Sequence, residues 1–369
     1  MGRYNVFVRS KIWGGCGVVK VGIVGASGYT GGELLRLLLR HPHAQITYLA
    51  SRTHAGVPLR DVSTAVLPDC DLEFRPLDIE AMVDECDVIF TAVPHGAAME
   101  FGPAVVAAGK RLIDIGTDFR FRNAGIYEAW YGIEHTCPDL TASAAYGLPE
   151  LFREQIAGSQ IVGNPGCYPT SVLLGLAPAL RAGIVDRTRI NIIAMSGASG
   201  AGATPSAMLH LPEATENLQV YGVAGHRHTP EIEQGIALLL GEPTDGSKNV
   251  PISFTPHLMP MSRGILASMV LFPTQSVDAD RLQEIYEEFY AGEPFVRVLK
   301  QDKLPATKPV RGSNMCHIGV RYDARSNRIL VFSAIDNLGK GAASQAIQNM
   351  NLLFGLPETA GIDVMGIYP

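Results

Sequence analysis

The sequence predicts an α/β protein in which a doubly wound parallel sheet is joined to an inserted α+β domain with a mixed, largely antiparallel sheet. Three observations support this prediction. A glycine turn joins a buried strand to a helix near the start of the chain, apolar strands then alternate with helical segments, and after about residue 165 the strands lengthen and hairpin turns appear. A chain of 369 residues is also too long for one ordinary core and suits two domains.

The first domain is expected over residues 18–165 and is of the Rossmann type. Residues 18–39 predict a buried strand, a glycine turn and a helix with apolar residues at 34, 35, 37, 38 and 39. Further strands are predicted over 44–51, 86–93 and 111–116, with a helical segment over 97–109. Strands that are apolar along their whole length are typical of a parallel sheet with both faces covered.

The second domain, expected over residues 166–330, has a different pattern. Its longer strands are predicted over 189–196, 249–258 and 263–273 and in a hairpin over 317–336. The remaining segment, 331–369, contains an amphipathic helix over 339–355 that we expect to return to the first domain. Residues 1–17 are basic and lack an apolar core, so we expect a disordered extension, although a transit peptide or a mis-set start would give the same pattern.

Composition narrows the function. The formal net charge of -6 argues against a nucleic-acid surface, because phosphate binding needs a concentrated excess of Lys and Arg. No apolar run approaches the ~18 residues needed to cross a bilayer, so no membrane partner is expected. The six cysteines, at 16, 70, 86, 137, 167 and 316, form no CxxC pair, which indicates neither disulfides nor zinc and suits a cytoplasmic protein. The expected partner is a small molecule.

The glycine turn is a candidate dinucleotide site. Glycines 25, 28 and 31 give G-x-x-G-x-x-G between a strand and a helix, where backbone must approach a pyrophosphate at a helix N-terminus. The cofactor contacts expected in this turn are Gly25, Ser27, Gly28, Tyr29, Thr30 and Gly31. About 20 residues further on, where an NAD enzyme would carry an acid, the strand ends in Ser51-Arg52. This pair suits a 2′-phosphate and favours NADP over NAD, and the less favoured alternative is that Arg52 is a solvated surface charge.

A cysteine is the candidate nucleophile. Cys167 lies in GNPGCYPT, residues 163–170, after a Pro-Gly turn and immediately before a predicted helix. The positive end of a helix dipole favours the thiolate, so we expect a lowered pKa for this thiol. Its position at the apparent domain junction also suits a cleft between a cofactor domain and a substrate domain. The cysteines at 70, 86, 137 and 316 are expected to be small buried hydrophobes.

Two histidines and two arginines are further candidates. His226 and His228 lie in GHRHTPE, and an extended segment would place both imidazoles in one cleft for acid-base work. A metal site there is poorly supported, since no third ligand is nearby in sequence. Arg120 and Arg263 could each pair with a substrate carboxylate or phosphate, and either could equally be a surface arginine. The loop 196–202, SGASGAG, could bind an anion through backbone N–H groups, beginning at Ser196 and Gly197, or be a flexible linker.

Nine motifs in order carry a resemblance to a known family. They are GASGYTGGE, AVPHG, GTDFR, YGLPE, GNPGCYPT, SGASGAG, GHRHTPEI, SRGI and AIDNLGKGAA. From about Val18 to the C-terminus the chain resembles the N-acetyl-γ-glutamyl-phosphate reductases of arginine biosynthesis, which are related to the aspartate-semialdehyde dehydrogenases. Family members have a Rossmann domain built from both chain ends, an inserted catalytic domain, and usually form homodimers or homotetramers.

The resemblance implies reduction of an acyl phosphate by NADPH through a cysteine thioester. It assigns Cys167 as nucleophile and His226 as acid and base, with His228 as the alternative. It further implies that Pro94 and His95 flank the nicotinamide and that Asn337 and Gly339 line the same side of the cofactor.

Three other functions remain open at this point. A reductase of LysW-linked aminoadipyl phosphate is one, but the GNPGCYPT segment resembles the arginine branch more closely. An aspartate-semialdehyde dehydrogenase is another, and the HRHTPE motif argues against it. The third is an NADP-binding regulatory module without chemistry, which would need neither Cys167 nor the two histidines.

Overall fold

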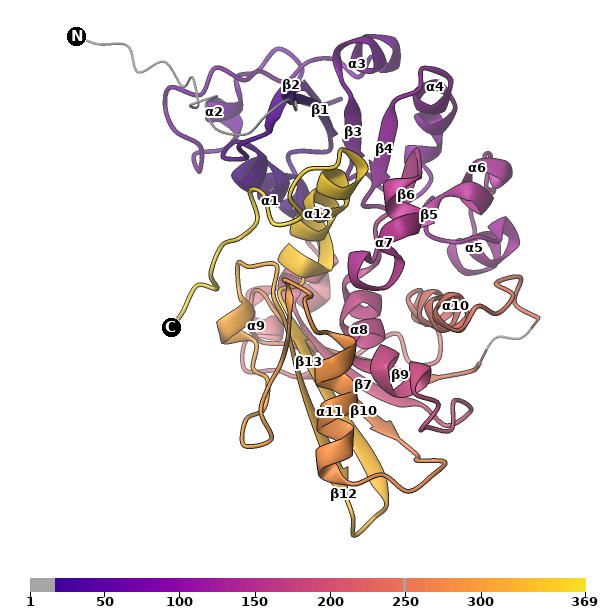
Figure 1. The fold of residues 1–369 in the computed structure, drawn as a ribbon. Coiled ribbons are helices and arrows are strands. Elements are labelled where there is room, and N and C mark those ends of the chain that lie inside the picture. Colours follow the sequence, from indigo (N-terminus) through magenta and orange to yellow (C-terminus); the bar gives the residue numbers. More distant parts are fainter. Residues whose placement is uncertain (1–16, 248–249) are drawn as a thin grey trace.

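A computed structural model describes residues 17–247 and 250–369 (Figure 1). Almost all of the extension expected over 1–17 lies outside these residues. Within the described ranges, the strands form one sheet of six strands and a second sheet of seven. This confirms the predicted fold class, a Rossmann-like parallel sheet joined to an α+β unit with a mixed sheet. No helix among the described residues combines the length and apolar character needed to cross a bilayer.

The parallel sheet has the order β2-β1-β3-β4-β6-β5, and all of its described pairings are parallel. Its strands are β1 (Val19–Val24), β2 (Ala44–Ala50), β3 (Val88–Thr91), β4 (Arg111–Asp114), β5 (Ala145–Tyr146) and β6 (Ile161–Gly163). The intervening helices are α1 (Tyr29–Leu38), α2 (Leu59–Val62), α3 (Ile79–Glu85), α4 (Gly102–Ala107), α5 (Ala124–Tyr131), α6 (Pro138–Ser143) and α7 (Pro149–Ala157). The strand order reverses between β1 and β3, so the loops that follow these two strands border the crevice where such sheets bind ligands.

The mixed sheet has the order β11-β12-β13-β10-β7-β9-β8. Its strands are β7 (Asn191–Gly197), β8 (Gln219–Val220), β9 (Ser253–Met259), β10 (Ile265–Leu271), β11 (Val296–Val298), β12 (Cys316–Asp323) and β13 (Arg328–Ile335), and its helices are α8 (Cys167–Arg181), α9 (Leu211–Ala214), α10 (Thr229–Leu240) and α11 (Ala279–Phe289). The hairpin predicted over 317–336 corresponds to antiparallel β12 and β13. Strand β13 stays in this sheet through Ile335, beyond the boundary expected at residue 330.

Helix α8 connects the two sheets. It follows β6 of the parallel sheet and packs against β10 and β13 of the mixed sheet and against α10. Its middle turns are apolar on all sides, and Val172, Leu173, Leu174 and Leu176 have no exposed surface. Helices with this pattern lie inside a core. The first residue of α8 is Cys167, which the fold therefore places at the junction of the two sheets.

The C-terminal segment lies at the same junction. A π-helical turn, η5 (Gly339–Ala343), leads into α12 (Ser344–Leu353), which packs against α7 and α1 beside the parallel sheet (Figure 1). The predicted amphipathic character is wrong, because the polar residues of α12 are also buried. Gln345 donates to the Thr170 hydroxyl and Asn349 to the Gly147 carbonyl, so these side chains link α12 to its neighbours instead of facing water.

Candidate active site

Two glycines make close contacts around Cys167 and the segment that precedes it. On one side, a Cβ on Gly163 would lie 2.1 Å from the Phe119 carbonyl oxygen. On the other, a Cβ on Gly341 would lie 2.8 Å from the Cys167 Cβ. Such distances are too short for any side chain, which explains both glycines. The segment before Cys167 therefore packs against the loop after β4, and Cys167 itself packs against η5.

A buried ion pair fixes the turn that precedes Cys167. Glu231, in the first turn of α10, has no exposed surface and accepts hydrogen bonds from the Gly166 N–H (2.8 Å), the Tyr146 hydroxyl (2.9 Å) and Arg120 Nη1 (3.1 Å). Arg120 is 6% exposed and also donates to the carbonyls of Asn164 and Ile115. Each of its nitrogens thus has a protein acceptor, which favours a positioning role for Arg120 over the substrate contact expected from the sequence.

The expected lowering of the Cys167 pKa is wrong for this structure. Burial raises the pKa of the Cys167 thiol to about 11. The charge of Arg120 and the backbone N–H groups of the first turn of α8 lower the pKa, but by less than burial raises it. The helix N-terminus is present as predicted, and the low-polarity surroundings outweigh it. The thiol is therefore protonated at neutral pH and needs a base before it can attack.

This protonation state predicts a pH dependence of alkylation. Between pH 7 and 9, the rate of iodoacetamide modification at Cys167 should rise about tenfold per pH unit, because only the thiolate reacts and its fraction grows in that proportion below the pKa. The measurement is peptide mass spectrometry over time, with the half-buried Cys70 as an internal reference. A rate at Cys167 that is already constant below pH 8 would mean that the resting thiol is ionised.

The two histidines meet, but not in the way the sequence suggested. Residues 226–228 form a turn instead of an extended segment, and the backbone N–H of His228 donates to His226 Nδ1 at 3.1 Å. The ring centroids are 4.9 Å apart. Because Nδ1 of His226 accepts a hydrogen bond, its neutral ring carries the proton on Nε2. The His228 ring lies against Gly166, since a Cβ there would be 2.4 Å from His228 Nε2.

Both imidazoles are neutral at physiological pH. Burial, with a smaller contribution from Arg227, lowers the pKa of His226 to about 4. Burial also lowers the pKa of His228 well below its usual value, and the nearby His226 and Arg120 add to this effect. The aromatic rings of Tyr168, Tyr221 and Phe254 surround His226 at centroid distances of 5.4–5.6 Å. A neutral imidazole can accept a proton at its free nitrogen and donate one from the other.

The loop after β4 holds the loop after β3. The Asp118 carboxylate accepts hydrogen bonds from the N–H groups of Gly96 and Ala98, both at 2.9 Å. The neighbouring Thr117 hydroxyl contacts His95 Nδ1, also at 2.9 Å. This fixes the Pro94–His95 segment at the carboxyl end of the parallel sheet. Sequence reasoning missed Asp118 and Glu231, although both lie in the motifs GTDFR and GHRHTPE.

The remaining substrate candidates lie together beside β7 and β10. A Cβ on Gly197 would lie 2.8 Å from the backbone nitrogen of Arg263, and Asn337 Nδ2 donates to the Ser199 hydroxyl. The Arg263 guanidinium, however, is bonded to the carboxylates of Glu33 in α1 and Asp336. The N–H groups of residues 197, 198 and 199 donate to carbonyls of residues 264, 261 and 262. These three N–H groups are therefore not free to bind an anion, contrary to the anion-site hypothesis for this loop.

The glycine turn has the shape that a dinucleotide site needs. A Cβ on Gly25 would lie 2.2 Å from the Ala92 carbonyl oxygen, and one on Gly31 would lie 2.3 Å from the Gly25 carbonyl oxygen. At Gly28, which precedes α1, the nearest atom would be 3.7 Å away, and no side chain caps the helix. The first N–H groups of α1 have no partner within the helix and can bind phosphate oxygens. The residues present thus fit a pyrophosphate.

Two of these glycines, Gly31 and Gly28, should separate an effect on stability from an effect on cofactor binding. Gly31→Ala should destabilise the protein by about 1–3 kcal/mol, because the new methyl group overlaps backbone that cannot move freely. Gly28→Ala should leave the melting temperature unchanged and still weaken NADP binding at least about tenfold, because the methyl group lies where the pyrophosphate approaches. Thermal unfolding and cofactor titration test both variants. Unchanged NADP affinity in Gly28→Ala would contradict this placement of the cofactor.

The expected adenosine end of the cofactor site is a cavity of about 470 Å³ that Ser51, Arg52, Pro76 and Glu100 help to line. Arg52 is exposed and pairs with Glu100 at 3.1 Å. The Ser51 hydroxyl accepts from the N–H groups of residues 53 and 54. The structure thus places both residues of the predicted 2′-phosphate contact in one cavity after β2.

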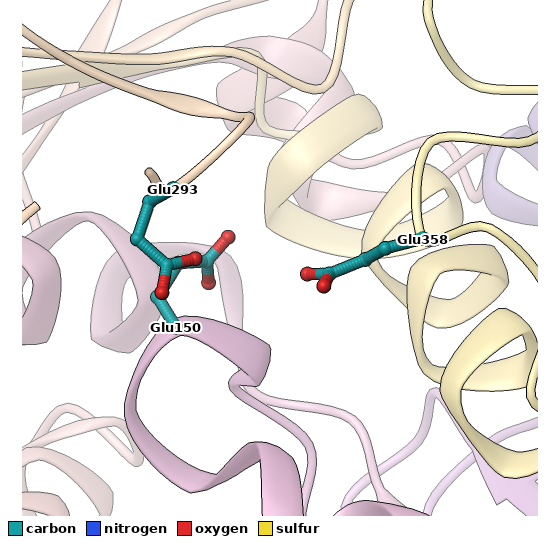
Figure 2. A group of neighbouring side chains, drawn as sticks. All are labelled: Glu150, Glu293 and Glu358. Atoms are coloured by element: carbon teal, nitrogen blue, oxygen red, sulfur yellow. The ribbon is translucent and has the colours of Figure 1, made fainter. Parts of the chain in front are cut away.

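Three carboxylates gather away from this site. Figure 2 shows Glu150, Glu293 and Glu358, whose nearest oxygens all lie within 4.8 Å of one another. Lys340 pairs with Glu150 at 2.6 Å, and Arg153 pairs with both Glu293 (2.6 Å) and Glu358 (3.1 Å). Because these two cations already pair with the carboxylates, the cluster is a structural network that joins α7 to the C-terminal segment.

Comparison with known proteins identifies the class. The family model described as "Semialdehyde dehydrogenase, NAD binding domain" matches residues 20–159, and "Semialdehyde dehydrogenase, dimerisation domain" matches residues 167–337. Aspartate semialdehyde dehydrogenase II from Vibrio cholerae superposes with a TM-score of 0.69 at 18% identity, covering 91% of this chain and 98% of that one. The Candida albicans enzyme, solved with NADP, gives 0.69 at 20% identity with the same coverage. Fold and site together define a semialdehyde dehydrogenase.

Closer relatives narrow the class. The N-acetyl-gamma-glutamyl-phosphate reductase of Desulforamulus reducens is 53% identical over 352 residues, 95% of this chain and all of the relative. That of Symbiobacterium thermophilum is 52% identical over 353 residues, again 95% of this chain and 99% of the relative. The chain belongs to the N-acetyl-γ-glutamyl-phosphate reductase family.

Proposed function

We propose that this protein reduces N-acetyl-L-glutamyl 5-phosphate to N-acetyl-L-glutamate 5-semialdehyde and phosphate with NADPH, in arginine biosynthesis. The observation that supports the proposal is the placement of Cys167 at the start of α8, after a turn that is held by Glu231 and that has the His228 ring packed against its Gly166. The relatives named above supply the substrate.

The chemistry begins with proton removal. Because the Cys167 thiol is protonated at rest, a neutral imidazole must take its proton as sulfur attacks the acyl carbon. The C–S bond forms, the bond from that carbon to the phosphoryl oxygen breaks, and phosphate leaves, which gives a thioester on Cys167. When bound, the reduced nicotinamide supplies a hydride to the thioester carbon. The resulting thiohemiacetal oxygen loses its proton as the C–S bond breaks, which releases the aldehyde and the thiolate.

We assign the proton steps to the histidine pair. His228, packed against Gly166 and kept neutral by burial, is the candidate acceptor for the thiol proton. His226 carries its proton on Nε2, which suits donation to the oxygen that becomes negative when the thioester is reduced. The aromatic rings around His226 disfavour a charged imidazolium. We therefore expect His226 to give up and regain its proton during the reaction and to stay neutral between steps.

The cofactor contacts follow from the same geometry. We place the pyrophosphate at Gly28, the nicotinamide between Pro94–His95 and the Asn337–Gly339 segment, and the 2′-phosphate at Ser51 and Arg52. Arg52→Ala should raise the KM for NADP about tenfold and leave the KM for NAD unchanged, because only NADP carries the phosphate that the guanidinium would bind. Initial rates with each cofactor measure this. Equal effects on both cofactors would contradict the assignment.

The reverse reaction tests the function. Purified protein is mixed with N-acetylglutamate semialdehyde, phosphate and NADP, and the absorbance of NADPH is followed. We expect turnover that depends on phosphate and that is much slower with aspartate semialdehyde. Turnover with aspartate semialdehyde alone would move the chain to the sister family. NADP binding without turnover of either substrate would favour a regulatory module.

We also propose a homodimer or homotetramer in the cytoplasm. The helix-facing residues of β7 and β10 are buried, whereas residues on the opposite face of the mixed sheet are only partly covered, and Ile193 is 50% exposed. A row of Ile193, Ser268 and Phe332 crosses three adjacent strands on this face, and a second copy could cover it. Light scattering of Ile193→Glu, which should dissociate the oligomer, tests the interface.

The described cysteines are all free thiols, which suits a reducing compartment.

A further inference from the structure

The substrate of the proposed reaction is an anion, and the two arginines that the sequence offers to bind it are already paired with carboxylates of the protein. Arg120 is neutralised by Glu231 and buried, and Arg263 is neutralised by Glu33 and Asp336. In both guanidinium groups the donors are directed at carboxylates and carbonyls of the protein itself. Neither of the two arginines expected to bind substrate is therefore available without breaking a buried or half-buried ion pair.

Arg227 differs from both. It is exposed, and within the described part of the chain its guanidinium forms neither an ion pair nor a hydrogen bond. It lies between His226 and His228 in sequence, and its Cζ lies 5.1 Å from the centroid of the Tyr131 ring. That ring is in turn 5.0 Å from the ring of His95. Arg227 therefore reaches from the histidine turn toward the loop that follows β3, on the side of the nicotinamide assigned above.

The geometry points to Arg227 as the residue that binds an oxyanion of the substrate, either the phosphoryl group or the carboxylate of the acyl chain. This inference rests on the proposed function. An exposed guanidinium held against an aromatic face keeps its in-plane N–H donors available, and those donors match the spacing of two oxygens on a carboxylate or a phosphate. Its position beside the acid-base pair would place the anion within reach of the reacting carbon.

Steady-state kinetics of the reverse reaction test the inference, with Arg227→Met, Arg227→Lys and the control Arg325→Met, an exposed arginine in the turn between β12 and β13. Arg227→Met should raise one KM about 10- to 100-fold, which is the loss expected for a charge-assisted hydrogen-bonded pair. A rise in the KM for phosphate identifies the phosphoryl group, and a rise in the KM for the semialdehyde identifies the carboxylate. The KM for NADP and the melting temperature should not change, and Arg227→Lys should recover part of the loss.

The inference is overturned if both KM values in Arg227→Met stay within about twofold of those of Arg325→Met, or if the loss is confined to kcat. A wild-type protein without turnover would count against the proposed function alone. In that case, calorimetric titration with N-acetylglutamate and with inorganic phosphate decides the inference separately. Weaker binding of either anion by Arg227→Met than by the control supports it, and equal affinities for both anions contradict it.

Discussion

Cys167→Ser should lose at least about 1,000-fold in turnover while the protein keeps its fold and its affinity for NADP. A serine hydroxyl is far harder to ionise than a thiol, and the low-polarity site that raises the thiol pKa to about 11 would disfavour an alkoxide still more. Removal of a nucleophile that acts together with a base usually costs several orders of magnitude. Reverse-direction rates and a thermal melt measure the two effects.

Cys70→Ser is the matched control, because Cys70 is half-buried like Cys167 but lies in the segment after α2 and not at the start of α8. Its rate should stay within about twofold of the wild type. Residual activity of Cys167→Ser within tenfold of the wild type would show that the reaction does not proceed through a thioester at this residue. The proposed chemistry would then be wrong.

The second large effect concerns the buried Arg120–Glu231 ion pair, which holds the turn before Cys167. Glu231→Leu should destabilise the protein by about 3–5 kcal/mol, because it leaves the buried Arg120 charge without its partner. It also removes the acceptor of the Gly166 N–H and of the Tyr146 hydroxyl, so the Cys167 turn loses its support. Urea unfolding and turnover under folding conditions should both report the loss.

A double variant separates this cause from general damage to the core. Arg120→Met combined with Glu231→Leu removes both charges, so it should be more stable than Glu231→Leu alone. Its turnover should remain low, because the Gly166 N–H still lacks its acceptor. A double variant that is less stable than either single variant, by the sum of their effects, would show that the two side chains act independently.

Much of the fold could be predicted because its signals are local. The strands of the parallel sheet are short apolar runs covered on both faces. The turn after β1 needs glycines where other backbone atoms come too close for a side chain. The hairpin of β12 and β13 could be predicted from its turn residues and from the alternation of apolar and polar residues along its strands. The surroundings of helix α12 could not be predicted, because a buried helix whose polar side chains bond to other elements has the same sequence pattern as an amphipathic surface helix.

The candidate site was less predictable because its electrostatics depend on burial. The sequence correctly placed Cys167 at a helix N-terminus. The motif could not show that burial raises the pKa of the thiol by more than the helix N-terminus lowers it. Similarly, Arg120 and Arg263 were expected to face substrate, and only the structure shows the carboxylates that already bind them. Glu231 acts on Gly166 across 65 residues of sequence, a contact that spacing does not reveal.

The central claim, a thioester on Cys167, is tested most directly by the first turnover without phosphate. The protein is mixed with N-acetylglutamate semialdehyde and NADP, NADPH is followed by stopped flow, and the quenched protein is analysed by intact and peptide mass spectrometry. We predict a burst of about one NADPH per site and an N-acetylglutamyl group on Cys167 that phosphate removes. A burst without a modified Cys167, or a modification on another residue, would contradict the account.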